Sequence, residues 1–195
     1  MSSPLNTAIT NLGSGEPSVR EAAAVEIYQI GRARAEQAAA AWWSDAELSG
    51  LLSGPKPELT VGLAVQRETF SKIRVAHSVS RLAEVPSDQD AEEFGLHFVN
   101  GVSLDVLTSR APGADGAIAG FLEKFGEGVQ QVEFLCSNVN RAAEILKEKF
   151  GVAAIYPETR AGADGTRINF FLAAVPAGGK VLIELYESPG KPHSK

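Results

Sequence analysis

Two segments near the C-terminal end of this 195-residue chain constrain its fold more than any other part. Gly128–Leu135 has the pattern of a β-strand and runs directly into a helix-like stretch, and Gly178–Tyr186 is a glycine turn followed by an apolar strand with Glu184 at its centre. Residues i and i+2 of a strand share a face, so Gln131 and Glu133 are expected to point the same way. Burying a carboxylate in an apolar strand is costly without a partner, which makes Glu184 the first candidate functional residue.

The same order of elements can be read twice along the chain. The first copy has predicted strands at residues 59–65, 81–86, 94–100 and 102–108, with a helix over 70–80 that could also be read as strand. The second has strands at 129–135, 152–156, 167–175 and 180–187. Its helix is expected to run from a cap at Asn138 or Asn140 to Phe150, with Gly151 as the C-cap. Asn100-Gly101 is a strong hairpin signal. Both last strands carry a central acid, Asp105 and Glu184, and the pattern predicts two βαβββ modules.

The N-terminal part reads as a helical extension. Met1–Gly15 is small, polar and glycine-bearing, and is expected to be loose. Pro17 predicts the start of a helix that reaches Trp43, weakened by Gly31. Ser44-Asp45 is a plausible cap for a short helix ending near Leu52.

The two adjacent tryptophans that close the long helix allow two interpretations. Trp42 and Trp43 are expected to pack on the main domain or on a partner subunit, and the alternative is a stacking platform for a ligand. The whole pattern divides the chain into an extension and linker (1–57), a first module (58–110), a connecting helix (111–128), a second module (129–187) and a tail (188–195).

Composition narrows the function classes. The formal net charge of −6 argues against a general nucleic-acid surface, and no long apolar run or signal-peptide pattern is present. The single cysteine, Cys136, can form no internal disulfide and is expected to be a buried, inert thiol. We therefore expect a cytoplasmic protein with a small-molecule ligand and no nucleic-acid or membrane partner; a homodimer remains open.

Three stretches carry a family resemblance: Ile118–Gly128, Gly162–Phe170 and Gly179–Leu185. They resemble methylmalonyl-CoA epimerases of the vicinal oxygen chelate superfamily, also called the glyoxalase/bleomycin-resistance fold. The likeness covers about half of the second module and its lead-in, and the first module matches in element order and in Phe98–Asn100. It implies an α+β protein whose two βαβββ modules form one curved, partly closed mixed sheet with the site inside. The N-terminal helical extension has no counterpart.

The resemblance also implies a set of metal-ligand positions, one on the first and one on the last strand of each module. In this sequence those positions are Thr60, Asp105, Gln131 and Glu184. The epimerases have histidine where this chain has Thr60 and Gln131, so a softer metal is not expected, although Mg²⁺ or Mn²⁺ could still bind such oxygens. Alternatively, the two carboxylates are hydrogen-bonded to Gln131 and Thr60 without an ion.

The chemistry that the resemblance implies is removal of a proton α to a thioester carbonyl. Glu184 or Glu133 is a candidate base, and His97 is a third, although the sequence does not show which face of its strand looks inward. A surface or structurally hydrogen-bonded histidine is the alternative for His97. His77 is expected on a helix exterior, and His193 in the tail.

The glycine-rich loop 160–166 is expected to edge the cavity, with Gly162 and Gly165 allowing close approach of a ligand and Arg160 and Arg167 meeting its carboxylate or phosphate. An ordinary loop between strands is the alternative. The resulting hypothesis is a protein that holds a small acidic or acyl metabolite as an isomerase or lyase. The alternatives are a non-catalytic, resistance-type binding protein and an interaction module with a vestigial cavity.

Overall fold

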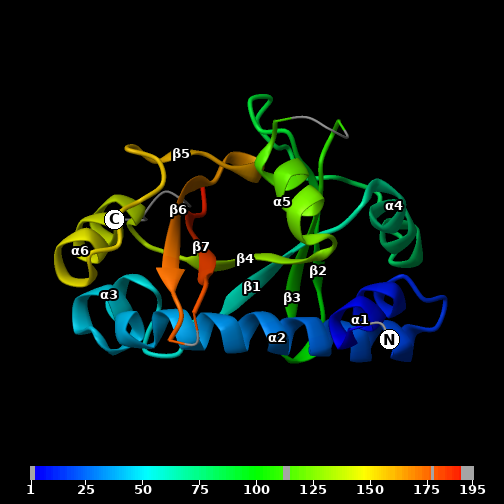
Figure 1. Cartoon of the computed structure of the whole chain (residues 1–195), viewed down its shortest axis with the longest axis horizontal. Coiled ribbons are helices and arrows are strands. Elements are labelled where there is room, and N and C mark those ends of the chain that lie inside the picture. The colour runs from blue at the N-terminus through cyan, green and yellow to red at the C-terminus, as the bar shows by residue number, and fades with distance from the viewer. Residues whose placement is uncertain (1–2, 112–114, 177, 190–195) are drawn as a thin grey trace, which may run out of the picture. The chain divides into compact units, whose positions relative to one another are not determined.

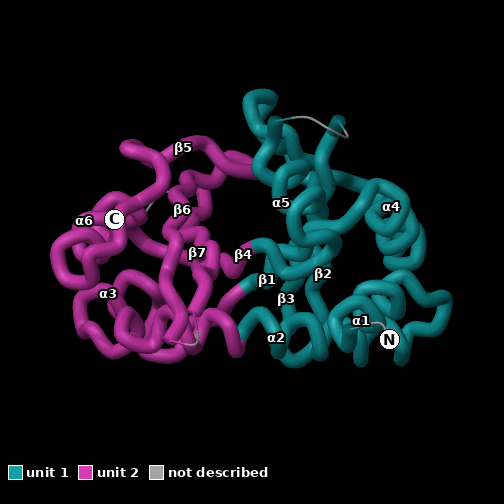
Figure 2. The backbone as a smooth tube through the Cα atoms, viewed as in Figure 1, with its two compact units in different colours: residues 1–32, 60–130 teal, residues 33–59, 131–195 magenta. Residues whose placement is uncertain are grey.

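The computed structural model describes residues 3–111, 115–176 and 178–189, which form two compact units (Figures 1 and 2). Unit 1 comprises Met1–Arg32 and Thr60–Gln130, and unit 2 comprises Ala33–Leu59 and Gln131–Lys195. The division falls inside helix α2 (Pro17–Ser44) and inside strand β4 (Gly128–Leu135), so each unit combines part of the N-terminal helices with one strand-rich module.

Unit 1 contains a mixed sheet in the order β2-β3-β1. Its elements after the N-terminal helices are β1 (Leu59–Ala64), α4 (Arg67–Ala76), β2 (Glu92–His97), the 3₁₀ turn η1 (Val99–Gly101), β3 (Ser103–Thr108) and α5 (Ala117–Phe125). Strand β1 pairs with β3 in parallel, and β2 pairs with β3 antiparallel. Asn100 and Gly101 both have φ of 71°, which confirms the predicted turn.

Unit 2 repeats this plan with a sheet in the order β4-β7-β6-β5. Its elements after β4 are α6 (Val139–Phe150), β5 (Arg160–Ala161), the 3₁₀ turn η2 (Ala163–Gly165), β6 (Arg167–Ala174) and β7 (Lys180–Glu187). The side chain of Asn138 caps α6 by accepting the Arg141 N–H, and Gly151 ends the helix in the left-handed region. Both helix ends confirm the sequence prediction.

The two modules place their central acids at equivalent points. Strand β4 pairs with β7 in parallel, as β1 does with β3. Asp105 lies opposite Gly62 in the first module, and Glu184 lies opposite Glu133 in the second. Thr60 lies two residues before Gly62 on β1, and Gln131 lies two residues before Glu133 on β4. The duplication inferred from the sequence is therefore also a duplication of strand register.

Aromatic contacts mark the core of each unit. In unit 1 the rings of Phe70 (α4) and Phe94 (β2) lie 4.8 Å apart. In unit 2 Trp42 meets Phe171 edge-on at 6.5 Å, and Trp43 meets Phe134 at 5.9 Å. The two tryptophans are only 3% and 8% exposed, so the packing interpretation is confirmed and neither ring is free to stack on a ligand.

Ion pairs tie the short helix α3 (Ala46–Leu51) to α6 within unit 2. Asp45 caps α3 as predicted, and its carboxylate also binds Lys149, while Glu47 binds Arg141. Hydrogen bonds to these cations hold the pKa of Asp45 and of Glu47 below their usual values. These pairs are largely exposed, so their net contribution to stability is small.

Gly31 shows why a glycine stands in the middle of α2. A Cβ at this position would lie 2.5 Å from Cγ2 and 2.7 Å from Cγ1 of Val61 on β1. We expect Gly31→Ala to destabilise the protein by about 1–3 kcal/mol, although alanine has the better helix propensity. Urea denaturation measures this. The control is Gly120→Ala in α5, where no atom lies within 4 Å and a gain of up to about 1 kcal/mol is expected. Equal effects of the two substitutions would contradict the close packing.

The expectation of a loose N-terminus was wrong, because helix α1 spans Pro4–Leu12. Ser3 caps it by accepting the Asn6 N–H, and Pro4 stands at the first helical position. The residues Ala8, Ile9 and Leu12 are buried, so packing stabilises a helix whose composition alone suggests none. Met1 and Ser2 lie outside the described residues.

Two predicted strands are not formed. Residues 81–86 form no strand, although the Ala83 N–H donates to the Glu93 carbonyl of β2. Residues 152–156 contribute only an isolated bridge from Ala154 to Phe171, because the side chain of Asn169 bonds both backbone groups of Tyr156. Arg160–Ala161 pairs with β6 instead, so the predicted loop 160–166 begins as a strand of a hairpin. The predicted connecting segment 111–128 and the tail 188–195 lie partly outside the described residues.

His77 is half-buried and does not lie on the helix exterior as expected. Its Nε2 atom is 3.0 Å from the carbonyl oxygen of Leu12, which links α1 to the end of α4, and its ring meets Phe98 edge-on. Burial is the main cause that lowers the pKa of His77 in the folded protein, and the charge of Arg20 adds to it.

This lowered pKa predicts a pH dependence of stability. The unfolded chain binds a proton at His77 more readily than the folded one, so the contribution of the neutral ring is present above pH 6.5 and is lost as the pH falls below it. We expect the wild type to lose more unfolding free energy than His77→Gln between about pH 7.5 and about pH 5.5. Equal losses in the two proteins, measured by urea denaturation, would show that His77 is not responsible.

Cys136 is buried, with 1% of its surface exposed, as predicted. Burial raises the pKa of its thiol to about 11. We expect a thiol reagent at about pH 8 to react slowly with the native protein and rapidly in urea. Fast labelling without denaturant would contradict this environment.

Among the helices of the described residues, none is both long and apolar enough to cross a membrane.

Candidate functional site

Three polar side chains meet on one face of the sheet in unit 2. Gln131 and Glu133 come from β4 and Glu184 from β7, on the face opposite the Phe134 and Phe171 rings. The Nε2 atom of Gln131 donates to Glu133 Oε1 at 3.0 Å and to Glu184 Oε2 at 2.7 Å. Gln131 and Glu133 are 6% and 7% exposed, and Glu184 is half-buried. One amide group therefore joins two carboxylates in a largely buried place.

The electrostatic role of Gln131 follows from the number of hydrogen bonds that its amide can donate. A primary amide has two N–H groups, and here one points at each carboxylate. Two carboxylates held this close repel each other, and a shared donor offsets part of that repulsion. The hydrogen bond from Gln131 to Glu184 agrees with the alternative in which the carboxylate is satisfied by a neighbouring side chain.

This arrangement of donors does not fit a metal ion. At the centre of the group, where a cation would have to meet both carboxylates, Gln131 presents its nitrogen, and an amide N–H cannot ligate a metal. The residues that the structure describes contain no group of three histidine, cysteine, aspartate or glutamate side chains suited to a metal. We therefore derive no chemical step through a metal.

Unit 1 gathers a second polar group on the corresponding face of its sheet. Asp105 lies opposite Gly95, and His97 lies opposite Ser103. The Nδ1 atom of His97 is 3.2 Å from Ser103 Oγ. A Cβ on Gly95 would lie 3.1 Å from Asp105 Oδ1 and 3.3 Å from His97 Nε2, so both side chains reach over this glycine.

The register places His97 on the same face of the sheet as Asp105. By strand alternation Thr60 of β1 also belongs to this face. Ser103 and Gly95 were missed by the sequence analysis. Counting alternate positions outward from Asp105 and His97 on the two predicted strands would have found both.

The two glycines of the predicted ligand loop have structural roles within their own hairpin. A Cβ on Gly162 would lie 2.5 Å from Thr166 Oγ1 and 2.6 Å from Ile168 Cγ2, so packing within the hairpin requires this glycine. Gly165 has φ of 76°, as its turn requires.

The two candidate arginines lie in different surroundings. Arg160 lies over the ring of Tyr156 at 4.4 Å. Arg167 pairs with Glu187 at 3.0 Å and donates to Thr159 at 2.9 Å. By the register of β6 and β7, Arg167 is on the face opposite Glu184, so Arg160 is the better placed of the two for the predicted ligand contact.

Comparison with known proteins gives both a sequence relative and solved structures. No protein-family model matches the chain. The uncharacterized protein YqjC of Bacillus subtilis is 34% identical over 82 residues, which cover 42% of this chain and 56% of that protein. The chain thus matches little more than half the length of this relative.

The structural similarities extend over more of the chain. Methylmalonyl-CoA epimerase from Mycobacterium tuberculosis is 30% identical with a TM-score of 0.54, over 68% of this chain and 87% of that one. A methylmalonyl-CoA epimerase in complex with methylmalonyl-CoA and NH₄⁺ is 29% identical with a TM-score of 0.52, over 67% of this chain and 93% of that one.

Together with the repeated modules, these similarities show that the chain belongs to the vicinal oxygen chelate superfamily. The predicted α+β, glyoxalase-like fold class is confirmed. Within this superfamily, the solved structures that it resembles at about 30% identity are methylmalonyl-CoA epimerases.

Proposed function

We propose that the protein is a metal-independent isomerase that binds a small acyl or carboxylate metabolite beside Glu133 and Glu184 and transfers a proton at its α-carbon. The observation that carries the proposal is the amide of Gln131, which holds two carboxylates at 3.0 and 2.7 Å. The similarity to methylmalonyl-CoA epimerases supports the reaction class.

The proposed chemistry uses the two carboxyl groups as a pair. Two neighbouring carboxyls can share one proton, which leaves one ionised as a base and the other protonated as an acid. The ionised group accepts the α-proton of the metabolite, whose C–H electron pair passes into the carbonyl to form an enolate. The partner carboxyl then gives its own proton to the opposite face of the α-carbon, which completes the isomerisation and leaves one proton on the pair, as at the start. Gln131 acts as a positioning residue, because it fixes both carboxylates without touching the substrate.

Asp105 and His97 are proposed as ligand-binding groups of the first module. Asp105 is half-buried between Gly62 and Gly95, and His97 is exposed. His97 is the one histidine among the described residues that lies beside a carboxylate, and it can donate a hydrogen bond to an anionic or carbonyl oxygen. Glu184 and Glu133, rather than His97, are the proposed bases because they lie together.

Isotope exchange tests the proposal. Methylmalonyl-CoA in deuterated water, with purified protein, is expected to gain deuterium at the α-carbon, detected by mass spectrometry. The protein should retain this activity after treatment with a chelator, and elemental analysis should find no stoichiometric divalent metal. Loss of exchange on chelation, restored by one added metal, would overturn the metal-independent mechanism.

A non-catalytic binding protein is the second candidate. It is favoured because both N–H groups of Gln131 are already used within the carboxylate group, which leaves this amide no donor for an enolate oxygen. For this candidate, methylmalonyl-CoA would bind in a calorimetric titration without any α-proton exchange. Exchange and binding measured on the same sample distinguish the two functions.

A further inference from the structure

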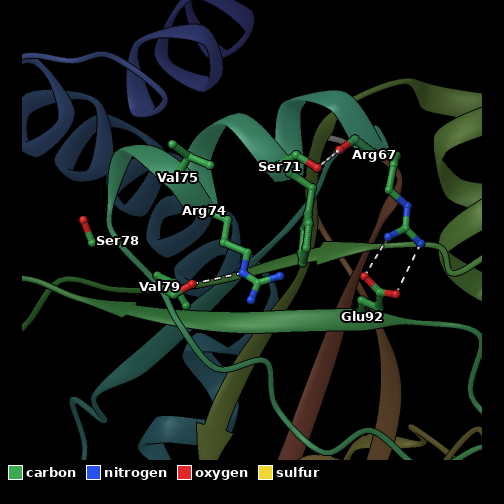
Figure 3. Close-up of a pocket in the computed structure, with 8 residues that line it drawn as sticks. Arg67, Ser71, Arg74, Val75, Ser78, Val79 and Glu92 are labelled. Atoms are coloured by element: carbon green, nitrogen blue, oxygen red, sulfur yellow. Dashed lines mark hydrogen bonds and ion pairs between the residues drawn. The ribbon is translucent and has the colours of Figure 1, made fainter.

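A separate pocket of about 380 Å³ lies in unit 1 between helix α4 and strand β2 (Figure 3). It belongs to the helix side of the sheet, because Glu92 and Phe94 share a face of β2 and Phe94 contacts Phe70 of α4. Asp105 and His97 are on the other face, so the pocket is distinct from the site proposed above. Its volume is at the small end of the range for ligand sites.

Arg74 is the polar group that defines the pocket. Its Nε and one terminal nitrogen donate to the carbonyl oxygens of Val79 and Ser80, both at 3.0 Å. The chain turns at Ser78, with φ of 54°, and this turn places the two carbonyl oxygens next to the Arg74 side chain. Figure 3 shows the guanidinium in the space between Val79 and Glu92. Within the described residues, no hydrogen bond is made by the remaining terminal nitrogen, Nη1.

The other charges of the pocket cancel. Arg67 pairs with Glu92 at 2.7 Å and also donates to the carbonyl oxygens of Ser109 and Arg110. This ion pair leaves Arg74 as the lining residue with an uncompensated charge. One guanidinium edge with a fixed orientation suits a carboxylate, whereas a doubly charged phosphate needs more donors.

The remaining lining residues are the apolar Phe70, Val75 and Val79 and the two serines Ser71 and Ser78. Phe70 is 2% exposed and contributes a buried ring, and Val79 lies beside the guanidinium. Val75 on α4 is 79% exposed and also lines the pocket. A pocket with apolar wall residues and one oriented cation suits an anion with a hydrophobic body.

We propose that this pocket binds a small monocarboxylate with an apolar or aromatic body, with Arg74 as its anion contact. The ligand replaces water at the unused Nη1 group of Arg74 and covers the side chain of Val75. The carboxylate is held by charge-assisted hydrogen bonds, and the body of the ligand buries apolar surface.

Benzoate is a suitable probe, with benzamide as its neutral counterpart and inorganic phosphate as the competing anion. In a ¹H–¹⁵N NMR titration, benzoate is expected to shift the backbone amides of residues 70–79 with saturation, and benzamide to do so at least tenfold more weakly. Equal shifts by benzamide, or saturating shifts by phosphate at the same concentration, would overturn the carboxylate assignment.

Substitution of Val75 tests the electrostatics without disturbing the core. Relative to Val75→Gln, Val75→Glu is expected to weaken benzoate binding roughly fivefold and Val75→Lys to strengthen it to a similar extent. Arg74→Gln is expected to abolish binding, with a circular dichroism spectrum as the check of folding. Equal dissociation constants for the three Val75 variants would overturn the proposal, even if Arg74→Gln proved unstable.

Discussion

Glu184→Gln is expected to reduce α-proton exchange in methylmalonyl-CoA by roughly 10²–10⁴-fold, because an amide cannot accept the proton. Glu184 lies next to Glu133 through the Gln131 amide, which donates to both. Glutamine keeps the size of the side chain, so the loss reports on the carboxylate rather than on packing. The rate is measured as deuterium gained per minute at saturating substrate.

The matched control is Glu148→Gln on α6, which removes an exposed carboxylate far along the helix from the Asn138 cap. It is expected to leave the exchange rate unchanged. Glu133→Gln should lower the rate as well, because the proposed mechanism uses both carboxyl groups. If Glu184→Gln and Glu133→Gln exchanged as fast as the wild type, the carboxylates would not be the catalytic bases.

Phe134→Ala is expected to lower the free energy of unfolding by about 3–5 kcal/mol. Phe134 is completely buried on β4 and meets Trp43 edge-on at 5.9 Å. The substitution removes the stabilisation from burying the ring. It also leaves a cavity that the neighbouring side chains fill only in part. Urea denaturation followed by tryptophan fluorescence measures the loss, since Trp43 is itself a partner of the ring.

Leu172→Ala in β6 provides the comparison, because Leu172 is 45% exposed. Its expected cost is below about 1 kcal/mol. A double substitution of Phe134 and Trp43 should cost less than the sum of the single substitutions, since both remove the same contact. Strict additivity would show that the edge-to-face contact of the two rings contributes nothing of its own.

Local signals predicted most of the elements. Pro17 at a helix start, Asp45 as a cap, and Asn138 and Gly151 at the ends of α6 act through backbone groups within a few residues, so their effect can be read without the fold. Asn100-Gly101 predicted its turn for the same reason. The prediction failed for α1, where burial of Ile9 and Leu12 stabilises a segment of weak local preference.

The site was predicted in its residues but not in its contacts. The strand pattern placed Gln131 and Glu133 on one face, and the repeated acid singled out Glu184. The amide of Gln131 binds both carboxylates only because β4 pairs with β7. Gln131 and Glu184 are separated by 53 residues in the sequence, so this pairing cannot be read from local signals. The same limit applies to Gly95, whose missing side chain matters only because Asp105 and His97 reach over it.

By itself the sequence determined the duplicated module, the helix ends, the tight turn and the faces of the strands, because these follow from local geometry and from a period of two residues. Only the tertiary structure decided which distant groups meet: Val61 against Gly31, Asn169 against the backbone of Tyr156, and Arg167 with Glu187 on the face away from Glu184. The reason is physical: these contacts depend on strand register and helix position, which are set by packing of the whole core.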